Sequence, residues 1–594
     1  MDPLEEYTAR SDRWRAAHRL LAGKFIRISN WRLAVIATAI ILAWLAVARS
    51  AALGGLLLIP LAAFVFLAVW HERVFRKQQF TARALAYYER AIARMKGAWV
   101  GTGNAGERFR DSAHIYSEDL DVFGKGSLFE LIASARTAAG ERTLADWLLA
   151  PACRDEAAAR QAAVQELRER LDLREDIALL GEDVRASVHA DVLDRWGSAP
   201  PAGFSSLVRW IALLLAIAGI ASLLAFLAHI TPLSVFIVIL GLDFVFIAIH
   251  RKRIATAIGG VETPAVDLQI LALLLERLEA EDFNSPKLKQ IRANLEVHGL
   301  PASKRIARLK RWIEMLDSSE HLFLRVVNPV VLWKEQLAMA VEAWRVESGP
   351  FIHGWISAVG EFEALSSFAS LAFERPEWIF PSLVDVASPR FEAQDLRHPL
   401  LPPSKCVPND VALGGDTRVL IVSGSNMSGK STLLRAIGLN AVLAWAGAPV
   451  AAASMHISSI RVGASIRVLD SLQDGRSRFY SEIVRLRQIV DLAGNTPGPL
   501  FLLDEVLSGT NSHDRRIGAA AVVRALVAHG AIGLITTHDL ALATLDQDKG
   551  LGIVNVHFDD EIEDGRIEFD YRLRPGVVVR SNALELMRAV GLQV

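Results

Sequence analysis

Cysteine is nearly absent from this sequence, which contains only Cys153 and Cys406 among 594 residues. The two are too far apart in sequence and context to suggest a disulfide framework or a cysteine-based metal site, and their scarcity fits a reducing cytoplasm. A net charge is lacking as well, because 65 Lys and Arg balance 66 Asp and Glu to a formal charge of -1. The chain as a whole is therefore not driven toward nucleic acid by charge. No short-period repeat or low-complexity tract is evident.

Long apolar runs, in contrast, are abundant in a chain that is 52% hydrophobic. Four runs have the length of a membrane-spanning helix or fall slightly short of it, at 33–48, 51–70, 211–230 and 233–249. Each consecutive pair predicts a transmembrane helical hairpin. The alternative is a pair of buried soluble hairpins, which the apolar character of every face disfavours. A cleaved signal peptide does not fit, because a charged stretch of about 30 residues precedes the first run and a second run follows at once.

Basic residues flank the outer ends of both predicted hairpins. They are Arg19, Lys24, Arg27, Arg32, Arg73, Arg76, Lys77, Arg251, Lys252 and Arg253. The positive-inside rule then places both termini and every long segment in the cytoplasm, in a multi-pass membrane protein with four spans. Asp243 lies near the middle of the fourth run, where a carboxylate is costly unless it is protonated or paired. We interpret Asp243 as a helix-packing residue, with a proton or ion path as the alternative.

The most specific motif is a phosphate loop that follows the apolar run 419–422. It has the pattern G-x-x-x-x-G-K-S and consists of Gly424, Ser425, Asn426, Met427, Ser428, Gly429, Lys430 and Ser431, with Thr432 next. Backbone N–H groups of such a loop wrap a phosphate, and the helix that opens near Lys430 directs its positive end at the same anion. We expect Lys430 to bridge the β- and γ-phosphates of a nucleoside triphosphate and the Ser431 hydroxyl to ligate Mg²⁺.

Two further apolar runs end in residues suited to hydrolysis. The run 500–503 ends in Asp504 and Glu505, which predicts a Mg²⁺ ligand at Asp504 and a carboxylate at Glu505 that polarises the attacking water. The run 531–536 predicts a third strand, and His538 follows it closely enough to sense the γ-phosphate. These residues together predict an α/β ATPase domain.

Two polar segments indicate which kind of ATPase this is. Residues 474–482 place Ser477 near the positive end of a predicted helix, and residues 508–514 directly follow the catalytic acids. Both segments read as surfaces that meet a second nucleotide site. With these segments the sequence resembles the MutS-family ATPases, relatives of the ABC ATPases in which two subunits sandwich two nucleotides. The likeness runs from about Phe391 to the C-terminus, and a weaker one at 127–151 resembles the start of the MutS helical core domain.

The resemblance carries further expectations for the site. It implies that Asn426, Lys430 and Ser431 bind ATP and Mg²⁺, and that Ser477 acts across a homodimer. It also implies a relation to DNA binding and mismatch repair. However, the chain has no G-x-F-Y-E segment near its N-terminus, so the mismatch-recognition domain is expected to be missing. Ser425, Ser428 and Ser508 replace residues that are commonly Pro, Gly and Arg in the family.

The chain divides, by these patterns, into five parts. We predict a lead with hairpin 1 at 1–77, a helical core-like segment at 78–201, hairpin 2 at 202–253, a helical lever-like region at 254–390 and the ATPase domain at 391–594. The predicted function is a membrane-anchored, MutS-like ATPase that moves helical arms as ATP binds and is hydrolysed. The alternatives are an ABC-type half-transporter, which the absence of an L-S-G-G-Q signature disfavours, and a scaffold that ATP only switches.

One basic run leaves the partner of the arms open. It comprises Lys287, Lys289, Arg292, Lys304, Arg305, Arg308, Lys310 and Arg311. Such a cluster can be a solvated helix face, a contact with anionic lipid head groups or a contact with DNA phosphates. Protein, lipid and DNA therefore all stay open as partners.

Overall fold

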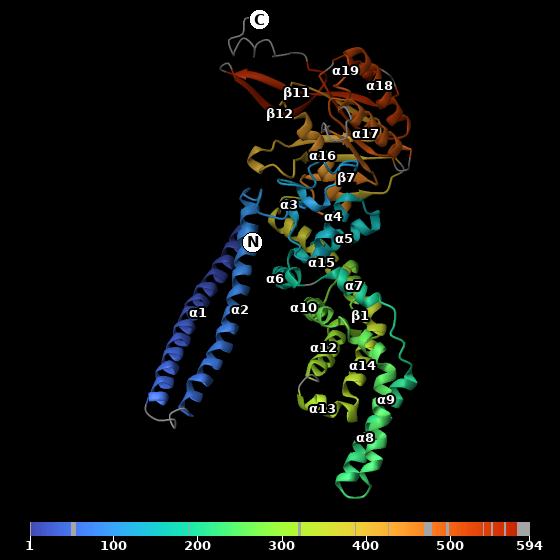
Figure 1. The fold of residues 1–594 in the computed structure, drawn as a ribbon. Helices are drawn as coiled ribbons and strands as arrows, with labels where there is room; N and C mark the ends of the chain where they lie inside the picture. The colour runs from blue at the N-terminus through green and yellow to red at the C-terminus, as the bar shows by residue number, and fades with distance from the viewer. Residues whose placement is uncertain are drawn as a thin grey trace. The chain divides into compact units, whose positions relative to one another are not determined.

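The computed structural model describes residues 2–48, 55–187, 189–318, 322–386, 388–425, 427–467, 478–494, 498–538, 540–547, 550–563 and 566–578. The chain forms two compact units. The first comprises Met1–Ala133, Pro151–Ala157 and Phe368–Val594, and the second comprises Ser134–Ala150 and Ala158–Ser367. Figure 1 labels the helices and strands in chain order.

A six-stranded sheet forms the centre of the ATPase-like part of the first unit. Its strands, in spatial order, are β12 (Arg566–Pro575), β11 (Ile553–Glu563), β6 (Val419–Ser423), β10 (Ile532–Thr537), β9 (Leu500–Leu503) and β8 (Val462–Ser465). All neighbours pair in parallel except β12, which runs antiparallel to β11. The central strands are buried along their whole length, as expected for a parallel sheet that is covered on both faces. The three apolar runs predicted as strands are β6, β9 and β10.

Helices cover both faces of this sheet. Residues of α17 (Arg478–Ala493) and α18 (Ser512–Ala528) pack with Phe501 and Leu503 in one apolar core. On the other face, α16 (Lys430–Ala446) approaches β9 at Gly438, where an added Cβ would lie 2.8 Å from Leu502. Asn511 caps α18, because its side chain accepts a hydrogen bond from the N–H of Asp514 at 2.8 Å.

The remaining elements of the first unit include a second sheet and short helices. The second sheet has the order β3 (Ser382–Val384), β7 (Ser454–Ser458), β4 (Phe391–Leu396), β5 (Asn409–Leu413). The short helices are α3 (Leu128–Ile132), α19 (Leu540–Ala543) and the 3₁₀ turns Glu107–Phe109, Pro403–Lys405 and Thr544–Gln547.

Two long helices, α1 (Pro3–Ala48) and α2 (Leu58–Met95), lie side by side as a hairpin (Figure 1). Their polar ends are held within the first unit. The Tyr7 ring lies 5.5 Å from Tyr88 and 5.2 Å from Phe373, and Arg94 forms a buried ion pair with Glu374 at 2.5 Å. The predicted first span, 33–48, therefore covers only the C-terminal part of α1. In the second predicted span, residues 51–54 lie outside the described residues.

The second unit is helical. Its elements are α4 (Ala138–Leu149), α5 (Arg154–Arg168), α6 (Leu171–Ser187), α7 (Ala190–Ser198), α8 (Ser206–Leu227), α9 (Leu233–Ile258), α10 (Glu262–Glu279), α11 (Pro286–Ala293), β1 (Glu296–Val297), β2 (Leu300–Pro301), α12 (Ala302–Ser318), α13 (Leu322–Val331), α14 (Trp333–Ser348), the 3₁₀ turn Gly349–Phe351 and α15 (Ile352–Glu374). The last residues of α15 belong to the first unit, and the first residues of α5 do so too.

Four described helices are long and apolar enough to cross a membrane, by length and composition. They are α1, α2, α8 and α9, which overlap the four predicted runs. The second run extends before the start of α2 at Leu58, and the third extends beyond the end of α8 at Leu227. Helices α8 and α9 form the second hairpin, and both touch α13. Asp243 of α9 is fully buried, and neither of its carboxyl oxygens has a hydrogen-bond partner among the described residues.

Candidate nucleotide-binding site

The phosphate loop joins β6 to α16 and needs its two glycines. Gly424 has a φ of 151°, and a Cβ at this position would lie 2.8 Å from the Ser428 hydroxyl and 3.1 Å from the Phe558 carbonyl oxygen. Gly429 has a φ of 104° and immediately precedes α16, whose first turn has no side-chain cap in the described part of the chain. The first N–H groups of α16 therefore face the loop without a competing side chain, as in an anion site.

Lys430 and two loop hydroxyls form the polar floor of this site. The Lys430 side chain is only 5% exposed, and its ammonium donates to the carbonyl oxygens of Gly424 at 2.9 Å and Ser425 at 2.7 Å. The hydroxyls of Ser425 and Ser428 are buried and have no hydrogen-bond partner among the described residues. Because phosphate oxygens accept from ammonium and hydroxyl groups alike, the loop fits a polyphosphate.

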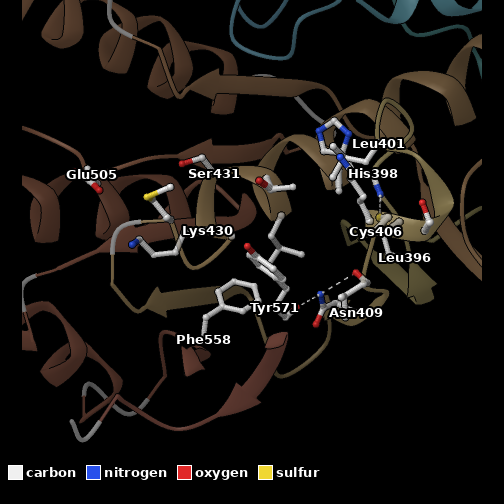
Figure 2. Close-up of a pocket in the computed structure, with 18 residues that line it drawn as sticks. Leu396, His398, Leu401, Cys406, Asn409, Lys430, Ser431, Glu505, Phe558 and Tyr571 are labelled. Carbon is white, nitrogen blue, oxygen red and sulfur yellow. Dashed lines mark hydrogen bonds between the residues drawn. The ribbon is translucent and has the colours of Figure 1, made fainter. Parts of the chain in front are cut away.

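A cavity of about 790 Å³ opens beside the loop (Figure 2). Figure 2 shows Lys430, Ser431 and Glu505 at one end and His398, Cys406 and Asn409 at the other. Of the residues predicted from the sequence for this site, the cavity is lined by Met427, Gly429, Lys430, Ser431, Thr432 and Glu505. Its other lining residues are Leu396, His398, Leu401, Ser404, Lys405, Cys406, Val407, Asn409, Leu433, Ala436, Phe558 and Tyr571.

An aromatic and apolar wall lines the cavity between these two ends (Figure 2). Asn409 holds this wall to β12, because its amide nitrogen donates to the carbonyl oxygen of Tyr571 at 3.0 Å and its amide oxygen accepts from the N–H of Leu573 at 2.7 Å. The rings of Tyr571 and Phe558 line the cavity there. Large planar side chains with few polar atoms suit a planar base. No pattern in the sequence signalled Phe558, because β11 reaches the cavity only through its place in the folded sheet.

His398 is built into the far end of the cavity as a neutral group. Burial, with a smaller contribution from the positive charge of Arg435, lowers the pKa of His398 to about 4. Its unprotonated Nδ1 accepts from the backbone N–H of Leu400 at 3.2 Å, and the backbone N–H of His398 donates to the Cys406 sulfur at 3.2 Å. Burial also raises the pKa of the Cys406 thiol. Both side chains therefore shape the wall as neutral groups at neutral pH.

The carboxyl ends of β9 and β10 bring together the predicted hydrolytic residues. The Glu505 carboxylate lies 2.5 Å from Nε2 of His538. The Thr536 hydroxyl donates to the Asp504 carboxylate and accepts from the N–H of Glu505, the latter at 3.0 Å. Asp504 and Glu505 thus differ in their partners although they are adjacent. No group of three or more His, Cys, Asp or Glu side chains that could hold a metal ion is found in the described part of the chain. A Mg²⁺ ion at this site would be held by the Ser431 hydroxyl and Asp504, because oxygen donors suit this cation.

Two predicted site residues lie outside the described residues. These are Asn426 of the loop and Ser477 of the predicted second surface. The other predicted surface is described, and it folds against the start of α18. Arg515 donates to the carbonyl oxygens of Leu507, Ser508 and Thr510 at 3.2, 3.1 and 3.2 Å.

A pair of aspartates that the sequence reasoning missed links this site to residues upstream. Asp119 accepts from the N–H groups of Ile466 and Arg467, both at 2.7 Å, directly after β8. Asp121 pairs with Arg435 of α16 at 3.2 Å and with Arg467 at 2.5 Å. A segment some 300 positions earlier in the chain is thereby tied to the helix that carries the phosphate loop. Nothing in the local sequence around these aspartates signals that contact.

The loop, the parallel sheet and the acidic strand ends define a phosphate-loop nucleotide-binding domain. Residues 420–593 match the family model described as MutS domain V, and residues 111–194 match that of MutS domain III. These two regions of the chain are therefore similar to domains of MutS-family proteins.

Two relatives show how far the similarity extends. The chain is 34% identical over 288 residues to "Endonuclease MutS2" of Anaeromyxobacter sp. (strain Fw109-5), and 34% identical over 247 residues to "DNA mismatch repair protein MutS 2" of Halobacterium salinarum. The matches cover 45% and 40% of this chain, but only 34% and 27% of the relatives. The chain therefore spans about a third of the length of the first relative and about a quarter of the second.

Proposed function

We propose that this chain is a membrane-anchored MutS-family ATPase, which binds ATP and Mg²⁺ at the phosphate loop and uses hydrolysis to change the arrangement of its helical parts. The observation that carries the proposal is the cavity beside Lys430. It combines buried phosphate-binding groups at one end with an aromatic wall of a size that suits a base, and Glu505 lines it beside the loop.

Each protein group has a distinct task in this proposal. Lys430, the N–H groups at the start of α16 and the hydroxyls of Ser425 and Ser428 bind the phosphates. Ser431 and Asp504 hold Mg²⁺, which when bound neutralises charge on the phosphates. Glu505 accepts a proton from the attacking water.

The first task of His538 is to orient the carboxylate of Glu505. Its Nε2 atom is within hydrogen-bond distance of the carboxylate, so it orients the base. When a γ-phosphate offers a competing acceptor, the same imidazole can donate to it instead. This exchange would give the site a way to detect the triphosphate.

We also propose that two copies of the chain complete the site, with Ser477 supplied by the second copy. This follows from family membership and from the polar surface at 508–514, which is folded by Arg515 next to the hydrolytic acids. A role with DNA is proposed from family membership alone. The two relatives are named as an endonuclease and a mismatch repair protein. The chain lacks the G-x-F-Y-E segment, so we expect no preference for mispaired duplex.

Membrane anchoring rests on α1, α2, α8 and α9. Large apolar side chains on these helices are exposed, including Leu33 at 66%, Trp44 at 68% and Leu214 at 63%. Apolar surfaces of this extent, on segments of membrane-spanning length in four helices, are costly to expose to water. Alkaline extraction of membranes that contain the protein tests this directly. Retention in the pellet supports anchoring, and release into the supernatant contradicts it.

The experiment for the enzyme is the ATPase rate of the full chain in nanodiscs, with and without paired, mismatched and branched DNA, at two salt concentrations. Stimulation that fades with salt supports DNA as the partner of the arms. Basal hydrolysis without stimulation supports a protein or lipid partner. Absence of both binding and hydrolysis would contradict the proposed enzyme.

A further inference from the structure

The basic run of the second unit separates, in three dimensions, into paired and unpaired cations. Lys287 pairs with Glu361 at 2.7 Å, Arg292 with Asp282 at 2.6 Å and Lys310 with Glu314 at 3.7 Å. These contacts are those of an ordinary solvated surface and need no external anion.

Lys289 of α11 is exposed and has no carboxylate partner among the described residues. Three cations of α12 lack such a partner as well, and these are called the unpaired cations below. They are Lys304, Arg308 and Arg311, which recur at helical spacing on one exposed face of α12. Like charges at this spacing repel each other in the absence of an anion. The buried face of the same helix carries Ile306 and Leu309, so packing of that face holds the three cations together on the opposite, exposed face.

The unpaired cations line a second cavity, of about 760 Å³, between α12 and α14. Small side chains, Ala307, Ala340 and Ala343, leave the space, and Trp312 and Trp344 form apolar walls. Arg308 lies 4.8 Å from the centre of the Trp312 ring, which fixes one guanidinium at the wall. The carboxylate in the lining is that of Glu347, and it is engaged by Arg305 at 2.9 Å.

The remaining wall comes from the first apolar hairpin helix of this unit. Arg209 of α8 lines the cavity and is anchored by a hydrogen bond to the Met339 carbonyl oxygen at 2.9 Å. Its neighbours Leu207 and Trp210 are 70% and 63% exposed, so the apolar surface of α8 begins at the turn that carries Arg209. In a membrane, that turn lies at the level of the lipid head groups.

We propose that this cavity binds the phosphate head group of an anionic phospholipid, with Lys304, Arg308, Arg311 and Arg209 as the cations that hold it. This proposal rests on the membrane anchoring proposed above. A phosphodiester satisfies the unpaired guanidinium groups in bidentate fashion, while the acyl chains follow the apolar side of α8. Duplex DNA is disfavoured as the occupant, because a recess walled by tryptophans and by the start of an apolar helix suits one head group and its chains better than an extended duplex.

The test measures phosphatidylglycerol binding to the full chain in detergent micelles, by native mass spectrometry. The pocket variant is Lys304→Gln/Arg308→Gln/Arg311→Gln. The control variant, Lys289→Gln/Arg292→Gln/Lys310→Gln, removes the same charge from the same run outside the cavity.

Each cation near an anionic surface contributes roughly fivefold to binding affinity. We expect the pocket variant to weaken phosphatidylglycerol binding at least tenfold and the control less than threefold. Arg311→Gln alone should cost about fivefold, which keeps the test valid if the triple variant folds poorly.

Several outcomes would overturn the proposal. Equal losses in the two triple variants would mean diffuse attraction to charge, and no loss in either would mean that the cavity binds no lipid. Glycerol phosphate that competes as well as phosphatidylglycerol would assign the cavity to a soluble phosphate. Duplex DNA binding that is lost only in the pocket variant, with lipid binding kept, would assign it to nucleic acid.

Flotation with phosphatidylcholine vesicles separates this proposal from membrane anchoring. Every variant should float with these neutral vesicles. If none does, anchoring itself is wrong and the lipid site is wrong with it. If all float but none prefers phosphatidylglycerol, only the head-group site is wrong.

Discussion

Nε2 of His538 lies 2.5 Å from Oε1 of Glu505, so a side chain that follows β10 is bonded to one that follows β9. Both strands are parallel neighbours, and their carboxyl ends meet at the same edge of the sheet. The pair is partly exposed, at 37% and 41% for the two side chains, and Glu505 lines the nucleotide cavity. This contact places the proposed base and the proposed sensor within one hydrogen bond.

Replacement of the base should separate binding from hydrolysis. In Glu505→Gln the side chain keeps its shape but can no longer accept a proton from water, so we expect hydrolysis to fall about 10²- to 10⁴-fold while ATP stays bound. Retained ATP should also increase the dimer fraction. Single-turnover hydrolysis and light scattering with ATP measure the two effects.

The matched control for this variant is Glu392→Gln, a partly exposed carboxylate on β4 whose partner is Arg390. It should leave hydrolysis within twofold of the parent. If Glu505→Gln hydrolyses ATP at the parent's rate, Glu505 is not the residue that activates water.

Removal of the loop ammonium should abolish tight binding. Lys430→Ala deletes the group that donates to the carbonyl oxygens of Gly424 and Ser425 and leaves the phosphates without their buried cation. We expect loss of at least tenfold in affinity, since a hydrogen bond to a charged group contributes about 1.5–3 kcal/mol. Equilibrium binding of a fluorescent ATP analogue measures this loss of affinity.

The control is Lys405→Ala, which removes an ammonium from another wall of the same cavity and should change affinity only a few-fold. A similar loss in both variants would contradict a special role for Lys430.

Local patterns in the sequence predicted the nucleotide loop and its strands well. A glycine-rich turn with Lys430, and apolar runs that end in Asp504 or precede His538, are signals contained in a few consecutive residues. The aromatic wall was not predictable in this way, because Phe558 reaches the cavity only through the pairing of β11 with β6. The predicted domain boundaries and the roles of the site residues stay predictions.

The basic run also shows that contacts made only through the fold cannot be predicted from local sequence. Its eight cations look alike in sequence, yet Lys287 is buried against Glu361 and Arg311 lines a cavity without a carboxylate partner among the described residues. That difference depends on which residues of α14, α15 and α8 come to lie next to each cation. Spacing along the chain carries no information about these neighbours.

Acid should weaken the first unit through His398. Its pKa is about 4 in the folded chain and 6.5 ordinarily, so the unfolded chain binds more protons between these values. Stability from this group is therefore complete above about pH 6.5 and is lost as the pH falls toward 4. The loss of unfolding free energy amounts to about 3 kcal/mol at most.

His398→Asn keeps an acceptor for the Leu400 N–H but does not titrate, so its melting temperature should depend less on pH in this window. His353→Asn, at a 79% exposed side chain, is the control and should follow the parent. Parallel curves for the parent and His398→Asn would contradict the prediction.

Helices α8, α9 and α13 meet at Gly219, and this glycine should not tolerate a methyl group. A Cβ there would lie 2.6 Å from the Val330 carbonyl oxygen and 3.4 Å from Oδ2 of the buried Asp243. Gly241 of α9 is the matched control, because a Cβ there meets nothing within 4 Å. In a helix, alanine is favoured over glycine by about 0.5–1 kcal/mol, so Gly241→Ala should raise the melting temperature in detergent slightly.

Gly219→Ala has the same intrinsic gain but must displace α13 or α9, which costs about 1–3 kcal/mol. We therefore expect opposite shifts of the melting temperature for two substitutions that are chemically identical. Asp243→Asn tests the same junction from the other side. The carboxyl oxygens of Asp243 have no hydrogen-bond partner among the described residues, and a neutral amide is less costly to bury than a carboxylate, so this variant should be at least as stable as the parent. A strong loss of stability in Asp243→Asn would mean that the carboxyl group itself is required, and would favour the proton or ion path over a packing role.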